Sequence, residues 1–134
     1  MSKVFVNEDW PKLLLVDPAT DGNPAVYELI EEFTFEMGDD SGATIKITIP
    51  KGFRTDLASV IRWLWFKFPP NGPWTRAALI HDYFYRNKTP FSRFFADSVF
   101  REVMRLDGVS TWKRVLMYYA VRSFGWMFFK KESD

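Results

Sequence analysis

Apolar and polar residues alternate along two stretches in the first part of the chain. Residues 32–37 read Glu-Phe-Thr-Phe-Glu-Met, and residues 44–49 read Thr-Ile-Lys-Ile-Thr-Ile. A period of two on β-forming residues is typical of strands that bury one face. Because the intervening Gly-Asp-Asp-Ser-Gly at 38–42 is turn chemistry, the pattern predicts a β-hairpin. A further strand is expected over 13–16, and Asp17-Pro18 ends it.

After Pro50 the pattern changes from strands to helices. Residues 59–68 form a compact apolar segment that suits one or two helical turns, and the proline-rich segment 69–73 then breaks any helix. Three longer helices are predicted: about Trp74 to Arg86, Arg93–Leu106 with Ser92 as its N-cap, and Ser110 or Thr111 to about Phe129.

The order of these elements predicts an α+β fold. A small N-terminal antiparallel β-sheet is followed by a three- to four-helix C-terminal half. Residues 1–134 are expected to form a single domain, mainly β over 1–50 and mainly α over 51–134. The composition agrees, because 47% of the 134 residues are hydrophobic, which is enough for a sizeable core and excludes global disorder.

Two features of the composition narrow the chemistry. The chain has no cysteine, which excludes disulfides, thiolate zinc sites and thiol nucleophiles. Aromatic residues make up 19% of the chain, more than a small core usually needs. Five of them are therefore candidates for a surface that binds a partner or a membrane: Trp63, Trp65, Phe66, Trp112 and Trp126. The competing interpretation of the last helix is that it is central and fully buried.

The near-neutral net charge of +1 conceals an uneven distribution. Residues 1–50 carry ten acidic and three basic residues, a net charge of −7, whereas residues 51–134 carry a net charge of +8. Such asymmetry suits either contact with an anionic partner or two halves that face each other within one fold. Because the bases are spread out rather than clustered, the second interpretation is favoured, or two ordinary solvated surfaces. The aromatic residues suit a protein partner or a lipid surface, and no basic run or known motif supports nucleic acid.

The location of the protein is predicted from two negative observations. The N-terminal sequence MSKVFVNEDWPK lacks the apolar region of a secretion signal. The most apolar stretch, 115–129, is shorter than the roughly 20 residues that span a bilayer, and it contains Arg122. A soluble cytoplasmic protein is expected, and inclusion in a particle is the alternative.

The candidate catalytic chemistry centres on His81, the only histidine. One histidine excludes HExxH zinc sites and multi-histidine metal sites. It suits a water-activating pair in which His81 is the general base and a buried Asp97 orients its ring. Tyr85 shares the helix face of His81, because the two are four residues apart, and it is placed to hydrogen-bond Asp97.

Two further carboxylates are candidate metal ligands. Asp56 follows the hairpin and Asp82 follows His81, and their oxygens, with backbone carbonyls, are hard ligands that suit Ca²⁺. Such an ion would polarise a carbonyl and stabilise an oxyanion.

The competing interpretation is a structural polar network. In it His81 is a core histidine and Asp56 is a helix N-cap. Asp82 pairs with Arg76 or Arg86. Asp97 is held by His81 or by Arg54.

Residues 49–126 resemble a family of uncharacterised phage and prophage proteins. The matching segments are IPKGFRTDLAS at 49–59, RWLW at 62–65, the proline loop at 69–72, AALIHDYFYR at 77–86, SRFFAD at 92–97 and VRSFGW at 121–126. The family often has proline where Ile61 stands here. This resemblance implies a viral or prophage protein of unknown function, located in the host cytoplasm or in the virion.

The segment His81-Asp82-Tyr83-Phe84-Tyr85 is similar to the HDxCY helix of phospholipase A2, with Phe84 in place of the cysteine. That resemblance implies that the histidine activates water, that the following aspartate binds calcium, and that the tyrosine hydrogen-bonds an aspartate on the next long helix, here Asp97. The chain departs from that family in lacking disulfides, a glycine-rich calcium loop and a secretion signal.

The sequence supports two candidate functions. The first is a phospholipase A2-like hydrolase that acts on an ester. In it the His81–Asp97 pair, with Tyr85 beside Asp97, activates water, and Asp56 and Asp82 bind a calcium ion. The second is a non-enzymatic phage protein, either a virion or tail component or a protein that binds a phage or host factor, in which the same cluster is a structural network.

Overall fold

The strands occupy the first half of the chain and the helices the second. The structure is a computed structural model that describes residues 4–7, 9–18, 26–56, 72–87, 90–127 and 129. The strands are β1 (Val4–Val6), β2 (Leu13–Asp17), β3 (Val26–Leu29), β4 (Phe33–Asp39), β5 (Thr44–Ile49) and β6 (Arg54–Thr55). The helices are α1 (Thr75–Arg86), α2 (Arg93–Leu106) and α3 (Thr111–Phe124), with a 3₁₀ turn, η2, at Gly125–Met127. This order confirms the predicted α+β class.

The strands form two small antiparallel sheets. One has the order β1-β4-β5, and the other has the order β2-β3-β6. The predicted hairpin is confirmed, since β4 pairs with β5 from Phe33 opposite Ile49 to Gly38 opposite Thr44. Its alternation is also seen in the packing, because Phe33, Phe35 and Ile49 are buried while Glu36 is exposed. Three strands that lack a long alternating run, β1, β3 and β6, had no signal in the sequence.

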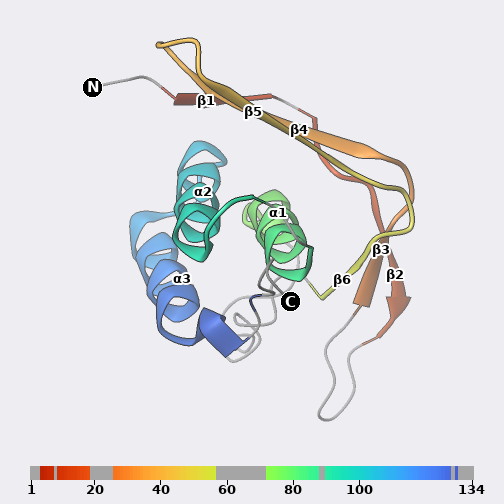
Figure 1. Cartoon of the computed structure of the whole chain (residues 1–134). Helices are drawn as coiled ribbons and strands as arrows, with labels where there is room; N and C mark the ends of the chain where they lie inside the picture. The colour runs from red at the N-terminus through yellow and green to blue at the C-terminus, as the bar shows by residue number, and fades with distance from the viewer. Residues whose placement is uncertain are drawn as a thin grey trace.

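Helix α1 is the centre of the molecule. It lies between β2, β3 and β6 on one side and α2 and α3 on the other, while the β1-β4-β5 sheet extends over α1 and α2 (Figure 1). Ten of its twelve residues are buried, which no single amphipathic face would give. The core includes Leu79 and Ile80 of α1, Phe100 of α2 and Met117 of α3. Polar side chains on α1 are therefore held inside the protein and need partners there.

The structure corrects the end of the last predicted helix. The described residues form three α-helices, and the predicted short segment 59–68 lies outside the described residues. The last helix ends at Phe124 rather than near Phe129 and continues as η2. Glycine at 125 explains the change, because it has a low helix propensity. None of the described helices combines the length and the apolarity needed to cross a membrane.

Candidate functional site

Helix α1 presents two polar pairs in two directions. His81 and Tyr85 are one turn apart and form one pair, and Asp82 and Arg86 form the other. Adjacent residues on a helix point about 100° apart, so the first pair faces α2 while the second faces β6. The side chains of His81, Asp82 and Tyr85 are buried, and each hydrogen-bonds a partner from another part of the chain.

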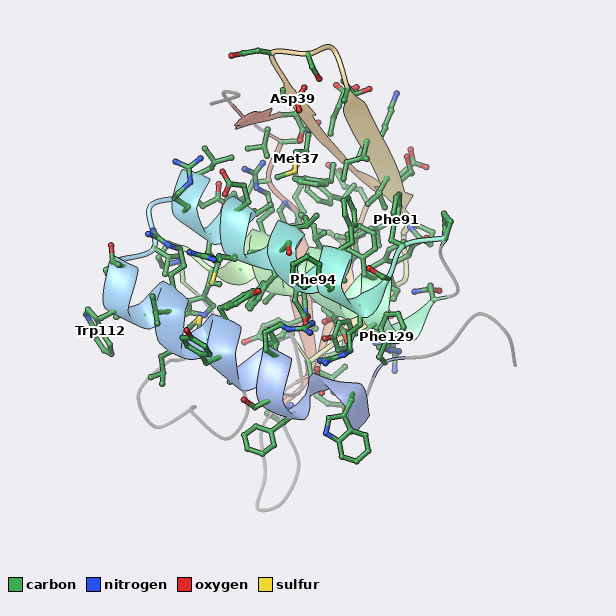
Figure 2. The ribbon with its side chains drawn as sticks, turned by 60° about the vertical axis from the view of Figure 1, so that its left-hand side comes forward. Met37, Asp39, Phe91, Phe94, Trp112 and Phe129 are labelled. Atoms are coloured by element: carbon green, nitrogen blue, oxygen red, sulfur yellow. The ribbon has the colours of Figure 1, made fainter. Side chains whose placement is uncertain are left out.

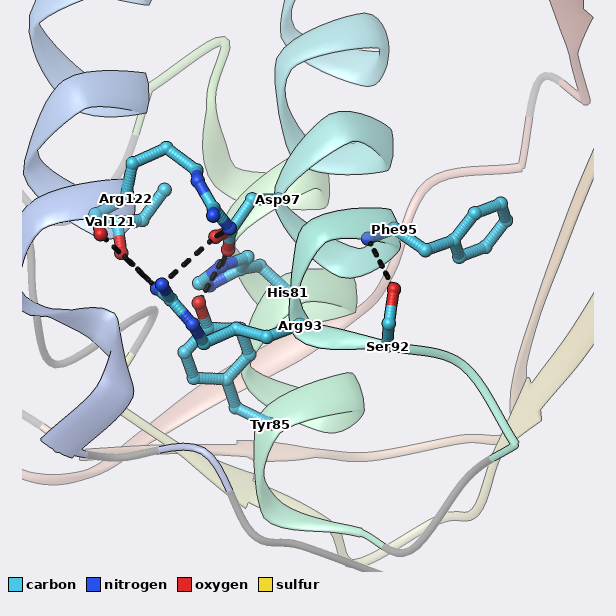
Figure 3. Close-up of polar contacts among 8 residues, drawn as sticks. All are labelled: His81, Tyr85, Ser92, Arg93, Phe95, Asp97, Val121 and Arg122. Atoms are coloured by element: carbon cyan, nitrogen blue, oxygen red, sulfur yellow. Dashed lines mark hydrogen bonds and ion pairs between the residues drawn. The ribbon is translucent and has the colours of Figure 1, made fainter.

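The first pair meets Asp97 of α2. His81 Nε2 lies 2.7 Å from Asp97 Oδ1, and the Tyr85 hydroxyl donates to the same oxygen at 2.5 Å. Both contacts agree with those expected from the sequence. The side chain of Asp97 is fully buried, so it has exchanged its water shell for these donors (Figure 3).

Two arginines complete the group around Asp97. Arg122 of α3 donates to Asp97 Oδ2 at 2.7 Å, and Arg93, one turn before Asp97 on α2, forms an ion pair with the same oxygen at 3.5 Å. Arg93 also donates to the carbonyls of Val121 and Arg122 near the end of α3 (Figure 3). The group therefore joins all three helices through a single carboxylate.

These contacts set the protonation states. Burial alone would raise the pKa of Asp97, but the hydrogen bond and charge of His81, with the bonds from Tyr85 and Arg122, outweigh it and lower the pKa. Burial and the neighbouring Asp97 carboxylate both raise the pKa of the Tyr85 hydroxyl. At neutral pH the group therefore holds an ionised Asp97 and a neutral tyrosine that donates to it.

The second ring nitrogen of His81 differs from the first. Among the described residues, His81 Nδ1 has no hydrogen-bond partner. The described part of the chain holds no fully buried side-chain nitrogen or oxygen that lacks a hydrogen bond. His81 as a whole is 2% exposed. In the tautomer that donates Nε2–H to Asp97, Nδ1 carries a lone pair that can accept a proton.

Gly125, at the end of α3, packs against Tyr85 and Arg93, two of the side chains around Asp97. A Cβ atom at this position would lie 2.5 Å from the Tyr85 hydroxyl oxygen and 3.2 Å from a guanidinium nitrogen of Arg93. Both distances are shorter than ordinary contacts allow. Glycine is therefore required here so that η2 can approach the side chains that hold Asp97.

The second pair on α1 faces β6. Thr55 donates to Asp82 Oδ2 at 2.7 Å and Arg86 donates to the same oxygen at 3.1 Å. Burial raises the pKa of Asp82, and the nearby charge of Asp56 raises it further, against the lowering effects of Thr55 and Arg86. Asp56 is therefore close enough to Asp82 to raise its pKa, and Arg54 and Arg86 line the same pocket as Asp56. The described residues contain no group of three or more acidic or histidine side chains arranged to hold a metal ion.

Two of the alternative pairings are corrected. Arg76 pairs with Asp107 at 2.7 Å rather than with Asp82, and Arg54 pairs with Glu28 at 3.0 Å rather than with Asp97. In both cases the fold places another acidic side chain, Asp107 or Glu28, next to the arginine. The pairing of Asp82 with Arg86 is confirmed.

Sequence reasoning missed several members of the two groups. Arg93 could have been found from its spacing of four residues before Asp97. Arg122, Thr55 and Gly125 come from distant segments and carried no local signal. Of the candidate surface aromatics, Trp112 and Trp126 are exposed, whereas Trp63, Trp65 and Phe66 lie outside the described residues.

Comparison with known proteins identifies the family. A family model described as "Protein of unknown function (DUF1353)" matches residues 27–121, which include both polar groups except Arg122 and Gly125. The chain belongs to the DUF1353 family. A DUF1353 assignment confirms the expectation of a domain of unknown function, and it carries no reaction with it.

One curated relative accompanies the DUF1353 match. The chain is 36% identical over 104 residues to "Uncharacterized protein y4jT" of Sinorhizobium fredii, a match that covers 75% of this chain and 29% of that protein. The chain thus spans less than a third of the length of this relative. No solved structure matches the chain.

Proposed function

We propose that the His81–Asp97 pair activates water and that the protein hydrolyses an ester. The observation that carries the proposal is the arrangement of the His81 ring. Its Nε2 atom is held by Asp97 at 2.7 Å, and its Nδ1 atom has no hydrogen-bond partner among the described residues.

The arrangement supports a definite direction of proton transfer. In the tautomer that donates Nε2–H to Asp97, Nδ1 carries the lone pair. Nδ1 accepts a proton from a water molecule while the water oxygen attacks the ester carbonyl carbon. The same proton then passes from Nδ1 to the leaving alkoxide, so the products are a carboxylic acid and an alcohol, and His81 returns to its starting state. Asp97 keeps the ring oriented, and Tyr85 fixes the carboxylate.

The proposal includes a calcium ion that binds the carboxylates of Asp56 and Asp82. The raised pKa of Asp82 supports it, because a buried carboxylate beside a second one is stabilised by a cation. The described residues supply two carboxylates, whereas Ca²⁺ takes six to eight oxygens, so backbone carbonyls and waters would complete the set. When bound there, the ion would balance the negative charge of the two carboxylates.

The experiment compares the protein with its His81→Asn variant on two esters. Phosphatidylcholine vesicles report lipid hydrolysis through released fatty acid, and a p-nitrophenyl ester reports simple esterase activity. We expect hydrolysis by the wild type and a loss of roughly a hundredfold or more in kcat in His81→Asn. Each assay is run with about 1 mM calcium and with a chelator, a range in which weaker protein calcium sites fill.

The control variant is Glu36→Gln, which changes an exposed carboxylate on β4 outside both polar groups and should leave the rate unchanged. If the wild type hydrolyses neither ester, or if His81→Asn is as active as the wild type, the hydrolase proposal is wrong. Loss of activity in Asp56→Asn and Asp82→Asn only when calcium is present supports the metal assignment.

A second candidate function is favoured by the two arginines around Asp97. Their charges already balance the carboxylate, which leaves it less able to stabilise a protonated His81. In this alternative the group is a structural network in a non-enzymatic protein, and the phage or virion role inferred from the sequence belongs to it. His81→Asn would then lower the unfolding free energy while no ester is hydrolysed by any variant.

A further inference from the structure

Helix α3 is apolar on two opposite sides. Its inner side carries the buried Met117 and Val121. Its other side carries residues that follow a helical spacing of three, four and seven, and we call this set the α3 outer face: Trp112, Val115, Leu116, Tyr119 and Trp126. The three aromatic members are 59%, 63% and 66% exposed, respectively.

The outer face continues onto the neighbouring helix. Phe94 of α2 is also exposed, and the guanidinium of Arg122 lies 5.3 Å from the centre of its ring. In Figure 2, Phe94 and Trp112 both lie on the side where α2 and α3 come forward, and Trp112 points away from the body of the protein. Apolar side chains thus extend over the outside of two helices rather than occurring singly.

The charges along α3 and its flanks have one sign. Between Asp107 and Glu132 the sequence contains five bases and no acid. Lys113 lies on α3 beside the outer face and packs within 5.7 Å of the Trp112 ring centre, whereas Arg122 is paired with Asp97. The acidic half of the chain forms the strands, which lie on the opposite side of α1 from α3 (Figure 1). The molecule is therefore polarised, with its basic and aromatic side at α3.

We propose that the α3 outer face binds an anionic lipid surface. Exposed tryptophan and tyrosine prefer the boundary between hydrocarbon and headgroup, and flanking lysine and arginine are attracted to anionic headgroups. The charge polarity also turns α3 toward such a surface and the strands away from it.

A second copy of the chain fits this face less well. In a two-fold symmetric dimer each outer face would meet its own equivalent. The basic α3 of one copy, with Lys113 beside the face, would then approach the basic α3 of the other, with no acid on α3 to balance the charge. The inference goes beyond the proposed hydrolase and does not depend on it, since it concerns where the protein lies and not what it cleaves.

The test measures binding to vesicles by flotation. Vesicles of phosphatidylcholine alone are compared with vesicles that also contain phosphatidylglycerol, an anionic lipid. We expect the wild type to float with the anionic vesicles, and binding to fall severalfold between about 0.1 M and 1 M salt, where the Debye length shortens from roughly 10 Å to 3 Å. The triple variant Trp112→Gln, Tyr119→Gln, Trp126→Gln should lose at least tenfold in binding.

Matched variants separate this outcome from others. Leu14→Gln with Leu15→Gln removes two exposed apolar residues of β2, on the strand side, and should leave binding unchanged. His81→Asn should float like the wild type, so a failed hydrolase leaves this result intact. The proposal is overturned if the wild type ignores anionic vesicles or if the triple variant binds equally well. It is also overturned if the wild type sediments as a dimer that the triple variant abolishes, because the face then belongs to a second copy.

Discussion

The two sides of α1 each bury a carboxylate, and they treat it in opposite ways. Toward α2 and α3, Asp97 is met by a histidine, a tyrosine and two arginines, and its pKa falls. Toward β6, Asp82 is met by one hydroxyl and one arginine, with Asp56 nearby, and its pKa rises. The side chains of Asp97 and Asp82 are 0% and 5% exposed, so burial alone does not separate them.

The difference lies in the number and charge of the donors. A buried carboxylate stays ionised when charge-assisted hydrogen bonds replace its hydration, and it favours protonation when they do not. The Asp97 group is therefore a satisfied anion that fixes three helices and the His81 ring. The Asp82 group supplies fewer charged donors to its buried carboxylate, so protonation of Asp82 is favoured.

Removing the charge of Asp97 is expected to have the largest effect on this contrast. Asp97→Asn leaves Arg93, Arg122 and His81 facing an uncharged amide, and breaking such a buried pair costs about 3 kcal/mol or more. We expect that loss in urea unfolding at pH 7. Because the folded-state pKa is lowered, the ionised carboxylate stabilises the protein above its unfolded-state pKa, and this contribution disappears as pH falls through the folded-state value. The loss on substitution should therefore shrink in acid, and a loss below about 1 kcal/mol at pH 7 would contradict the description of the group.

Adding one methyl group at Gly125 should disturb the same group from outside. The new Cβ would lie 2.5 Å from the Tyr85 hydroxyl oxygen, so either η2 or the tyrosine must move. Overpacking of this kind costs about 1–3 kcal/mol, and we expect Gly125→Ala to lower the thermal midpoint accordingly. Ser123→Ala, two residues before Gly125 at an exposed position, is the control and should have little effect. An unchanged midpoint in Gly125→Ala would show that η2 does not press on Tyr85.

The sequence predicts the parts of this contrast that depend on local spacing. The hairpin follows from alternation, and α2 follows from Ser92 and the Asp107-Gly108 end, with both bounds matching the structure. The contact of His81 and Tyr85 with Asp97 was expected from residues four apart on one helix and an acid on the next. Each of these needs only a repeat period or a single helix–helix contact.

The parts that could not be predicted depend on how distant segments meet. Arg122 reaches Asp97 across 25 positions of sequence, and Thr55 reaches Asp82 across 27. Strand β6 has two residues and exists only because β3 is beside it. Such contacts are decided by the packing of the whole core, which no local pattern records.

Asp82→Asn tests the opposite side of α1 and should change stability in the opposite direction. Because the folded-state pKa of Asp82 is raised, the ionised form is disfavoured in the folded protein, and stability falls as pH rises through that value. The neutral amide removes this penalty. We therefore expect Asp82→Asn to be more stable than the wild type at pH 7 and to lose its advantage below about pH 4, near the unperturbed value.

Urea unfolding across this pH range gives the measurement. Asp56→Asn should shift the wild-type curve in the same direction by a smaller amount, because its charge is only one of the causes that raise the Asp82 pKa. A variant Asp82→Asn that is less stable than the wild type at pH 7 would mean that Thr55 and Arg86 already satisfy the carboxylate. The two sides of α1 would then not differ as described.

The smallest expected effect concerns how the helices that hold Asp97 begin. Ser92 caps α2, the helix of Asp97, and its hydroxyl oxygen accepts a hydrogen bond from the Phe95 amide at 3.0 Å (Figure 3). Ser110 stands at the same place before α3, the helix of Arg122, and makes no side-chain cap. Ser92→Ala should therefore cost about 1 kcal/mol in urea unfolding, and Ser110→Ala, the matched control, clearly less. Equal costs would mean that the serine hydroxyl is not what fixes the start of α2. Asp97 would then be positioned by its contacts with α1 and α3 alone.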